Sequence, residues 1–216
     1  MAENGLDPAD VRRPGRPACG RGERAVVADH AQAGAHVVPR SRSPRRLRVF
    51  LALWPDADTA AVLHAHGRAL QAACGGRLMR RDTVHLTLAF IGEVEADAVA
   101  RIQAIAAQVQ GARFELVLDR VGSWHGHRIV WAGASSTPAP LAALAQALDA
   151  KLRTAGFELE ARAFFPHVTL VRNARSTPEP DGVQAVRWAV DSFVLVCSER
   201  LASGAHYRVL GRWPLA

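Results

Sequence analysis

Apolar residues follow two different periods along this chain, and the periods divide it into predicted helices and strands. Three stretches repeat apolar residues every three or four positions and predict helices: 56–73, 95–110 and 137–155. Each is followed by glycine, which commonly ends a helix. Shorter stretches, in which apolar residues alternate with others or run together, predict strands: 47–53, 84–91, 113–119, 129–133, 166–171, 187–197 and 205–213.

The order of these elements predicts the fold class. A strand, a helix, a strand, a helix and a pair of strands are followed by a helix, a strand and a pair of strands. The two halves are similar in kind, because each places a strand directly after a helix, and this indicates an internal duplication. We therefore expect an α+β fold in which two small antiparallel sheets meet in a cleft.

Residues 1–46 differ in composition from the rest of the chain. They contain nine arginines and five acidic residues, are rich in proline, glycine and serine, and show no sustained period. This composition predicts a disordered basic N-terminal extension, 1–46, in front of a folded domain, 47–216. The extension could provide loose RNA affinity, but a plain flexible leader or a start codon assigned too far upstream is favoured.

Composition narrows the class of protein. The chain has an apolar fraction of 49%, enough for a substantial core, and a net charge of +7, which favours anionic partners. All basic residues except Lys151 are arginine, whose planar guanidinium suits phosphate. The three cysteines, Cys19, Cys74 and Cys197, show no paired spacing, so we expect a reducing compartment. Neither a membrane-spanning run nor a secretory signal is evident, which predicts a soluble, cytoplasmic protein.

One short pattern occurs twice, and both copies lie in predicted strands. Residues 85–88 are His-Leu-Thr-Leu, and residues 167–170 are His-Val-Thr-Leu. Side chains two positions apart on a strand point to the same face, so each histidine should project beside its threonine while the apolar residues face the core. The copies are 82 residues apart, and only a fold that joins the two halves would let them share one site.

Two histidines that face each other suit general acid–base catalysis, because one imidazole can be neutral and the other protonated near neutral pH. Phosphoryl transfer to water fits this division, with Thr87 and Thr169 donating hydrogen bonds to phosphate oxygens. No cluster of Asp, Glu or Cys accompanies the motifs, so neither a metal nor another cofactor is required. The alternative is that both histidines have only a structural role, as half-buried strand residues with satisfied hydrogen bonds. The occurrence of the same motif twice disfavours this alternative.

Other histidine pairs in the chain are weaker candidates. His64 and His66 lie two residues apart on a predicted helix, on different faces, and are interpreted as solvated or edge residues. His125 and His127 could ligate a metal, but no third ligand is evident nearby, and a loop between two strands is favoured.

The two motifs together resemble those of the 2H phosphoesterases, and most closely the RNA 2′,3′-cyclic phosphodiesterases once named 2′-5′ RNA ligases. The resemblance covers about residues 47–216 and includes the segments TVHLTLAFIGEV, IVWAG and FFPHVTLVR. It implies a bilobal fold of two antiparallel-sheet lobes with pseudo-twofold symmetry around a central cleft. It also implies metal-independent hydrolysis of a terminal 2′,3′-cyclic phosphate to a 2′-phosphate.

The resemblance further implies roles for individual residues. His85 would protonate the leaving 3′ oxygen as proton donor, and His167 would activate water as proton acceptor. Thr87 and Thr169 would hold the phosphate, and Arg172, five residues after His167, would contact it. Phe50 could stack on a base or could have a structural role. Where the family usually has a tryptophan-containing stretch before the first motif, this chain has Leu-Met-Arg-Arg at 78–81, so we expect a different base or ribose contact there.

Two alternatives remain open from the sequence. The first is an RNA- or nucleotide-binding module that uses the cleft without turnover, against which both acid–base residues argue. The second is an enzyme with the same histidines, either a 2′-5′ RNA ligase or a small-nucleotide cyclic phosphodiesterase. The expected partners are RNA ends or small cyclic nucleotides, with no membrane, and the expected state is a monomer. The physiological substrate is not given by the sequence, and the assignment of acid and base rests on the resemblance.

Overall fold

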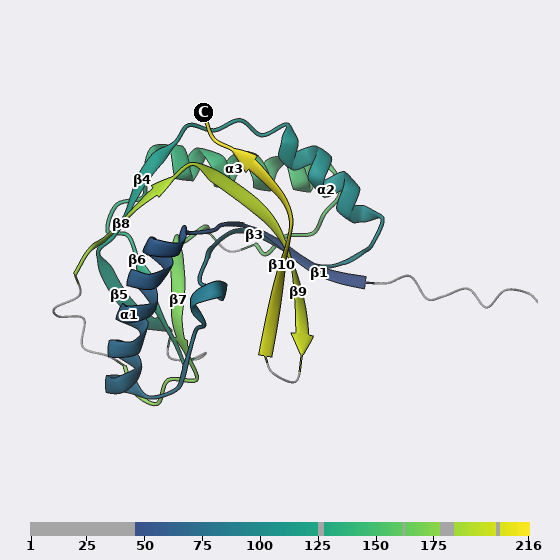
Figure 1. The fold of residues 1–216 in the computed structure, drawn as a ribbon. Helices are drawn as coiled ribbons and strands as arrows, with labels where there is room; N and C mark the ends of the chain where they lie inside the picture. The colour runs from purple at the N-terminus through teal and green to yellow at the C-terminus, as the bar shows by residue number, and fades with distance from the viewer. Residues whose placement is uncertain (1–45, 125–127, 162, 178–183, 202–203) are drawn as a thin grey trace, which may run out of the picture. The chain divides into compact units, whose positions relative to one another are not determined.

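A computed structural model describes residues 46–124, 128–161, 163–177, 184–201 and 204–216 (Figure 1). The predicted N-terminal extension therefore lies outside the described residues, except for Arg46, and so do His125 and His127.

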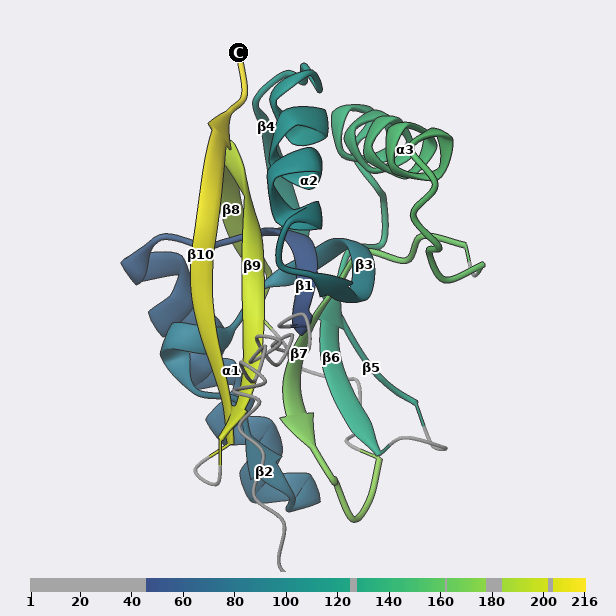
Figure 2. The same ribbon diagram turned by 90° about the vertical axis from the view of Figure 1, so that its right-hand side faces the viewer.

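Most of the strands form one antiparallel sheet in the order β10-β9-β1-β3-β7-β6-β5, with β2 paired to β7 (Figure 2). The strands of this sheet are β1 (Arg46–Leu53), β2 (Arg77–Leu78), β3 (Leu86–Glu95), β5 (Arg120–Trp124), β6 (Ile129–Gly133), β7 (His167–Arg172), β9 (Ser192–Leu201) and β10 (Gly204–Pro214). A second sheet has two strands, β4 (Phe114–Leu118) and β8 (Val186–Val190).

The large sheet consists of two halves joined at one point. Strands β10, β9, β1 and β3, which include the first and the last strand of the described chain, form what we call the terminal half-sheet. Strands β2, β7, β6 and β5 form the middle half-sheet. Among the described residues, the only pair between β3 and β7 is Leu86 with Val168. The sequence predicted two separate sheets that meet, whereas the structure links them through this single pair.

Helices cover one face of each half-sheet. Helix α1 (Ala57–Cys74) packs against β7, while α2 (Ala98–Ala107) and α3 (Ala139–Thr154) pack against β3 (Figure 1). Asp56 caps α1 by accepting a hydrogen bond from the Thr59 amide at 2.7 Å, and Gly75 ends it with a φ of 68°. The predicted helices are confirmed, although the second is shorter than expected because β3 continues to Glu95.

The main core lies between the helices and the covered face of the sheet. Its fully buried members include Leu63 of α1, Leu148 of α3, and Leu86 and Val168 at the junction of the half-sheets. A second, smaller cluster is formed by Phe50, Ala52, Val194 and Val196, with Trp54, Phe90 and Tyr207 packed against it. This cluster gives the terminal half-sheet a second apolar face beside the motif histidines.

Two strands differ from the prediction. Strand β5 was not predicted: no element was assigned to 120–122, and Ser123 and Trp124 were placed in the loop between two predicted strands. The single strand predicted at 187–197 is two strands, β8 and β9, which separate at Asp191 and enter different sheets. A short helix, η1 (Arg81–Thr83), leads into the first motif.

Candidate active site

The two histidine motifs lie side by side at the junction of the half-sheets. Leu86 and Val168 are antiparallel partners, and both are fully buried. The residues on either side of them point to the opposite face of the sheet, where His85, Thr87, His167 and Thr169 are all half-buried. The register places His85 across from Thr169, and Thr87 across from His167. Four polar side chains from distant parts of the chain therefore share one surface.

Both histidine rings are oriented in the same way. Nδ1 of His85 lies 2.7 Å from the carbonyl oxygen of Thr83, and Nδ1 of His167 lies 2.9 Å from that of Phe165. Because a carbonyl oxygen can only accept, each Nδ1 carries the hydrogen and donates it. This arrangement leaves Nε2 of each ring as the nitrogen that can take up or release a proton at the site.

Three aromatic rings enclose His85. The indole of Trp54 stacks on the imidazole with a centroid distance of 5.4 Å and an interplanar angle of 5°. Tyr207 meets the imidazole edge-on at 5.3 Å, and the tilted ring of Phe50 lies 4.9 Å away. These rings come from β1, the turn after it, and β10, so the terminal half-sheet builds the whole enclosure.

This enclosure changes the protonation of His85. Burial among the rings lowers its pKa from 6.5 to about 4, and the nearby guanidinium of Arg172, together with His167 when that ring is protonated, contributes to this lowering of the pKa. The Thr83 carbonyl, which favours the imidazolium, opposes part of this effect. In the protein without substrate at neutral pH, His85 is therefore neutral.

His167 lies against a more open aromatic wall. Trp124 meets its ring at 4.5 Å with an angle of 78°, and Phe165 stacks on it at 6.0 Å. Trp131 lies behind Phe165 at 4.9 Å. The side chain of Phe165 is 44% exposed, so this wall presents an aromatic surface to solvent. The two histidines thus have different surroundings although their motifs are alike.

Arg172 reaches the same face as the histidines because β7 contains a bulge. Simple alternation would put a residue five positions after His167 on the core side of the sheet. In the pairing of β7 with β6, Thr169 faces Trp131 and Val171 faces Val130, so Leu170 is an extra residue. The bulge turns Val171 into the core, where it is fully buried, and turns Arg172 to the histidine side.

A cavity of about 970 Å³ begins at Thr87 and His167 and extends along α3. Its walls include Trp124, Phe164 and Phe165, together with Gln146 and Arg153 of α3. His85, Thr169 and Arg172 do not line it, so the cavity lies at the His167 end of the motifs. No hydrogen bond between described residues uses the hydroxyl of Thr87 or Thr169, which leaves both hydroxyls available to a ligand.

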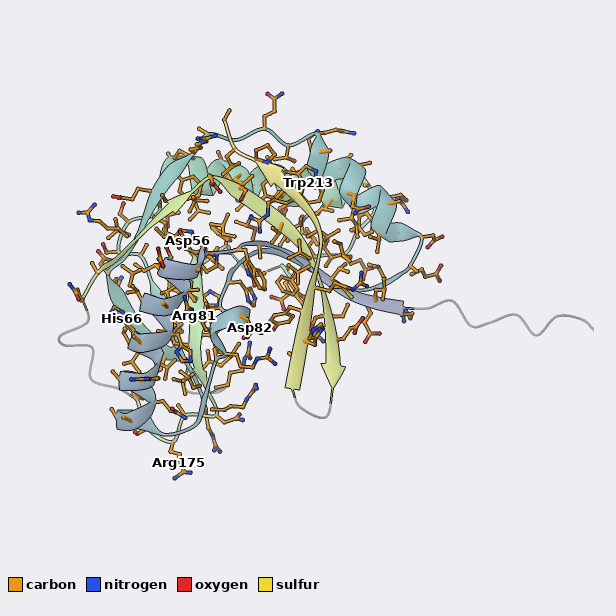
Figure 3. All side chains as sticks on the ribbon, viewed as in Figure 1. Asp56, His66, Arg81, Asp82, Arg175 and Trp213 are labelled. Atoms are coloured by element: carbon orange, nitrogen blue, oxygen red, sulfur yellow. The ribbon has the colours of Figure 1, made fainter. Side chains whose placement is uncertain are left out.

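Two other sequence predictions concern metals and membranes. Within the described ranges, no group of three or more His, Cys, Asp and Glu side chains could hold a metal ion. In the same part of the chain, no helix combines the length and apolar character that a membrane crossing needs. His66 was predicted as a solvated or edge residue, and the structure supports the edge position: the residue is half-buried, its Nδ1 is buried without a hydrogen-bond partner among the described residues, and burial lowers its pKa (Figure 3).

The sequence profile of the 2′-5′ RNA ligase superfamily matches residues 54–201. The chain belongs to this superfamily. It is 36% identical over 142 residues to the RNA 2′,3′-cyclic phosphodiesterase of Escherichia coli, over 65% of this chain and 80% of that protein. It is 28% identical over 136 residues to the RNA 2′,3′-cyclic phosphodiesterase of Archaeoglobus fulgidus, over 62% of this chain and 76% of that protein.

Solved structures of other proteins share this fold. The crystal structure of E. coli LigT complexed with 3′-AMP matches with a TM-score of 0.73 and 32% identity, over 79% of this chain and 99% of that one. The crystal structure of a Thermus thermophilus protein matches with a TM-score of 0.66 and 26% identity, over 77% of this chain and 97% of that one. The predicted family and the antiparallel α+β fold are therefore confirmed.

In this superfamily member, the structure brings together the five residues predicted for the phosphate site, His85, His167, Thr87, Thr169 and Arg172. Phe50 differs from them: its ring is 4% exposed and packs between His85 and Tyr207, which favours the structural role over base stacking.

Four aromatic residues that surround the histidines were not predicted from the sequence: Trp54, Trp124, Phe165 and Tyr207. Phe165 lies two residues before His167, and Trp54 directly follows the predicted strand 47–53. These positions in the sequence were the available signal that both rings lie near the site. Nothing in the sequence indicated that Tyr207, near the end of the chain, would contact His85.

Proposed function

We propose that this chain hydrolyses the terminal 2′,3′-cyclic phosphate of RNA to a 2′-phosphate by paired-histidine acid–base catalysis. The observation that carries the proposal is the single face on which two Nδ1-anchored histidines, two threonines and an arginine meet. The RNA 2′,3′-cyclic phosphodiesterases among its relatives support the choice of substrate.

In this mechanism the phosphate lies between the two histidines. Nε2 of His167 takes a proton from water as the water attacks phosphorus. Nε2 of His85 gives a proton to the leaving 3′ oxygen, so one phosphorus–oxygen bond forms as the other breaks. Thr87, Thr169 and Arg172 bind the non-bridging oxygens, whose negative charge they stabilise.

The low pKa of His85 describes the protein without substrate, and substrate binding must raise it. A phosphate anion bound by Arg172 offsets the repulsion of this guanidinium for an imidazolium at His85. The anion also favours the imidazolium directly. We therefore propose that His85 takes up its proton only when the phosphate is bound.

The proposal extends to two structural points. The half-sheets each contribute one motif strand, β3 or β7, and we propose that they derive from an internal duplication with a pseudo-twofold axis near the Leu86–Val168 pair. We also propose that hydrolysis needs no metal, because the histidines and Arg172 supply the proton transfers and the charge stabilisation.

Product analysis of a short RNA ending in a 2′,3′-cyclic phosphate, with EDTA present, tests this function. The expected product is a 2′-phosphate. His85→Ala and His167→Ala should abolish turnover, while His64→Ala, on α1 away from the site, should not. A 3′-phosphate product would reverse the leaving oxygen, and full activity of either site variant would refute the paired-histidine mechanism. Loss of activity with EDTA, restored by a divalent metal, would refute metal independence.

A further inference from the structure

Strand β2 brings a second arginine to the edge of the phosphate site. Arg77 is the antiparallel partner of Arg172, and Leu78 is the partner of the fully buried Val171. Val171 lies in the core, and Leu78 lies on the same face, against Gly67 of α1, so Arg77 and Arg172 point together to the histidine side. The edge of β7 that pairs with β3 at Val168 also pairs with β2 at Val171 and Arg172. The phosphate site therefore extends along this edge to Arg77.

The close approach of β2 depends on Gly76. Its φ is +90°, and a Cβ at this position would lie 2.7 Å from the Arg172 carbonyl oxygen and 2.8 Å from the Ala174 amide nitrogen. The Met79 amide adds a hydrogen bond to the Leu170 carbonyl oxygen at 2.8 Å. The backbone thus holds two arginines opposite each other on neighbouring strands.

Two like charges directly opposite each other destabilise an antiparallel pair unless an anion lies between them. Among the described residues, neither Arg77 nor Arg172 forms an ion pair. Within the part of the chain that the structure describes, the pair is therefore uncompensated, and a cationic pair of this kind suits phosphate.

We propose that Arg77 binds the internucleotide phosphate that precedes the terminal cyclic phosphate, so that the preferred substrate is an RNA strand and not a cyclic mononucleotide. This inference rests on the proposed function. Along β7 the order is His167 with Thr87, then Thr169 with His85, then Arg172 with Arg77. Because His85 protonates the leaving 3′ oxygen, the ribose lies on the His85 side, and the strand that precedes it continues toward Arg77.

Two matched dinucleotides that end in a 2′,3′-cyclic phosphate test the proposal. One has an ordinary internucleotide phosphate, and the other has a neutral methylphosphonate, so the bases and the reacting group are the same. A charge-assisted contact predicts that kcat/KM for the phosphate substrate exceeds that for the methylphosphonate by roughly tenfold or more. Arg77→Gln should reduce this ratio to near one. It should also reduce the dependence of log KM on log salt by about 0.7.

Arg68→Gln is the matched control, because Arg68 is exposed on α1 and its loss changes the net charge equally. It should keep the wild-type ratio. The side chain of Arg77 makes no hydrogen bond or ion pair with a described residue, so Arg77→Gln should fold normally. A wild-type ratio near one, or a ratio unchanged by Arg77→Gln, would overturn the inference and leave the proposed function intact. Failure to turn over either substrate would instead refute the proposed function.

Discussion

Replacement of Trp54 by alanine should raise the pKa of His85. The indole stacks flat on the imidazole at 5.4 Å, and it is one of three rings that keep water from His85. Alanine would open one face of the imidazole to solvent. Water would then stabilise the imidazolium, which the native enclosure disfavours.

The size of the effect follows from the native shift. A change from 6.5 to about 4 corresponds to about 3 kcal/mol against the charged ring. If the three rings share this enclosure, removal of one should restore about one pKa unit, so His85 in Trp54→Ala should titrate near a pKa of about 5. At a pH of about 5.5 the protonated fraction would rise from about 3% to about 25%.

The assay is an NMR titration of the imidazole Cε1–H signals, with His85 assigned by its absence in His85→Gln. Trp213→Ala is the control, since Trp213 also stacks on a ring at 5.4 Å, that of Phe193, but contacts neither histidine (Figure 3). It should leave the pKa of His85 unchanged. A wild-type His85 that titrates near its ordinary pKa of about 6.5, or no rise in Trp54→Ala, would refute the account of aromatic burial.

Three further predictions concern stability. The pKa of His85 is lower in the folded than in the unfolded chain, so the free energy of unfolding falls as pH falls from 6.5 to about 4. In urea unfolding over this pH range, His85→Gln should lose up to about 3 kcal/mol less stability than the wild type. Gly76→Ala should cost about 2 kcal/mol or more, measured in the same way, because a Cβ would meet the Arg172 carbonyl; an unchanged midpoint would contradict this. Asp56→Ala should lower the thermal midpoint by an amount equivalent to about 1 kcal/mol, and Asp56→Asn, which keeps the cap, should restore most of it.

The elements that the sequence predicted well are those whose signals are local. The apolar stripe of α3, the Asp56 cap and the glycines after α1 each lie within a few residues of the structure that they determine. The His-x-Thr spacing likewise placed four polar side chains on one face, because alternation along a strand is local geometry.

The parts that the sequence did not predict depend on contacts between distant segments. The pairing of Leu86 with Val168 joins strands that are far apart in the chain, and neither motif indicates its partner. Arg172 faces the site only because of the bulge at Leu170, which strand alternation does not reveal. Tyr207 encloses His85 through the order of strands in the sheet, and this order follows from tertiary packing.

The interleaved order of the half-sheets has a consequence for protein synthesis. By the time the ribosome has added Arg172, every strand of the middle half-sheet, with His167, has been made. The terminal half-sheet must wait, because β9 begins at Ser192 and Tyr207 lies on β10. A nascent chain therefore holds both histidines long before the surroundings of His85 can be completed. The aromatic enclosure of His85 should therefore remain incomplete until β10 leaves the ribosome.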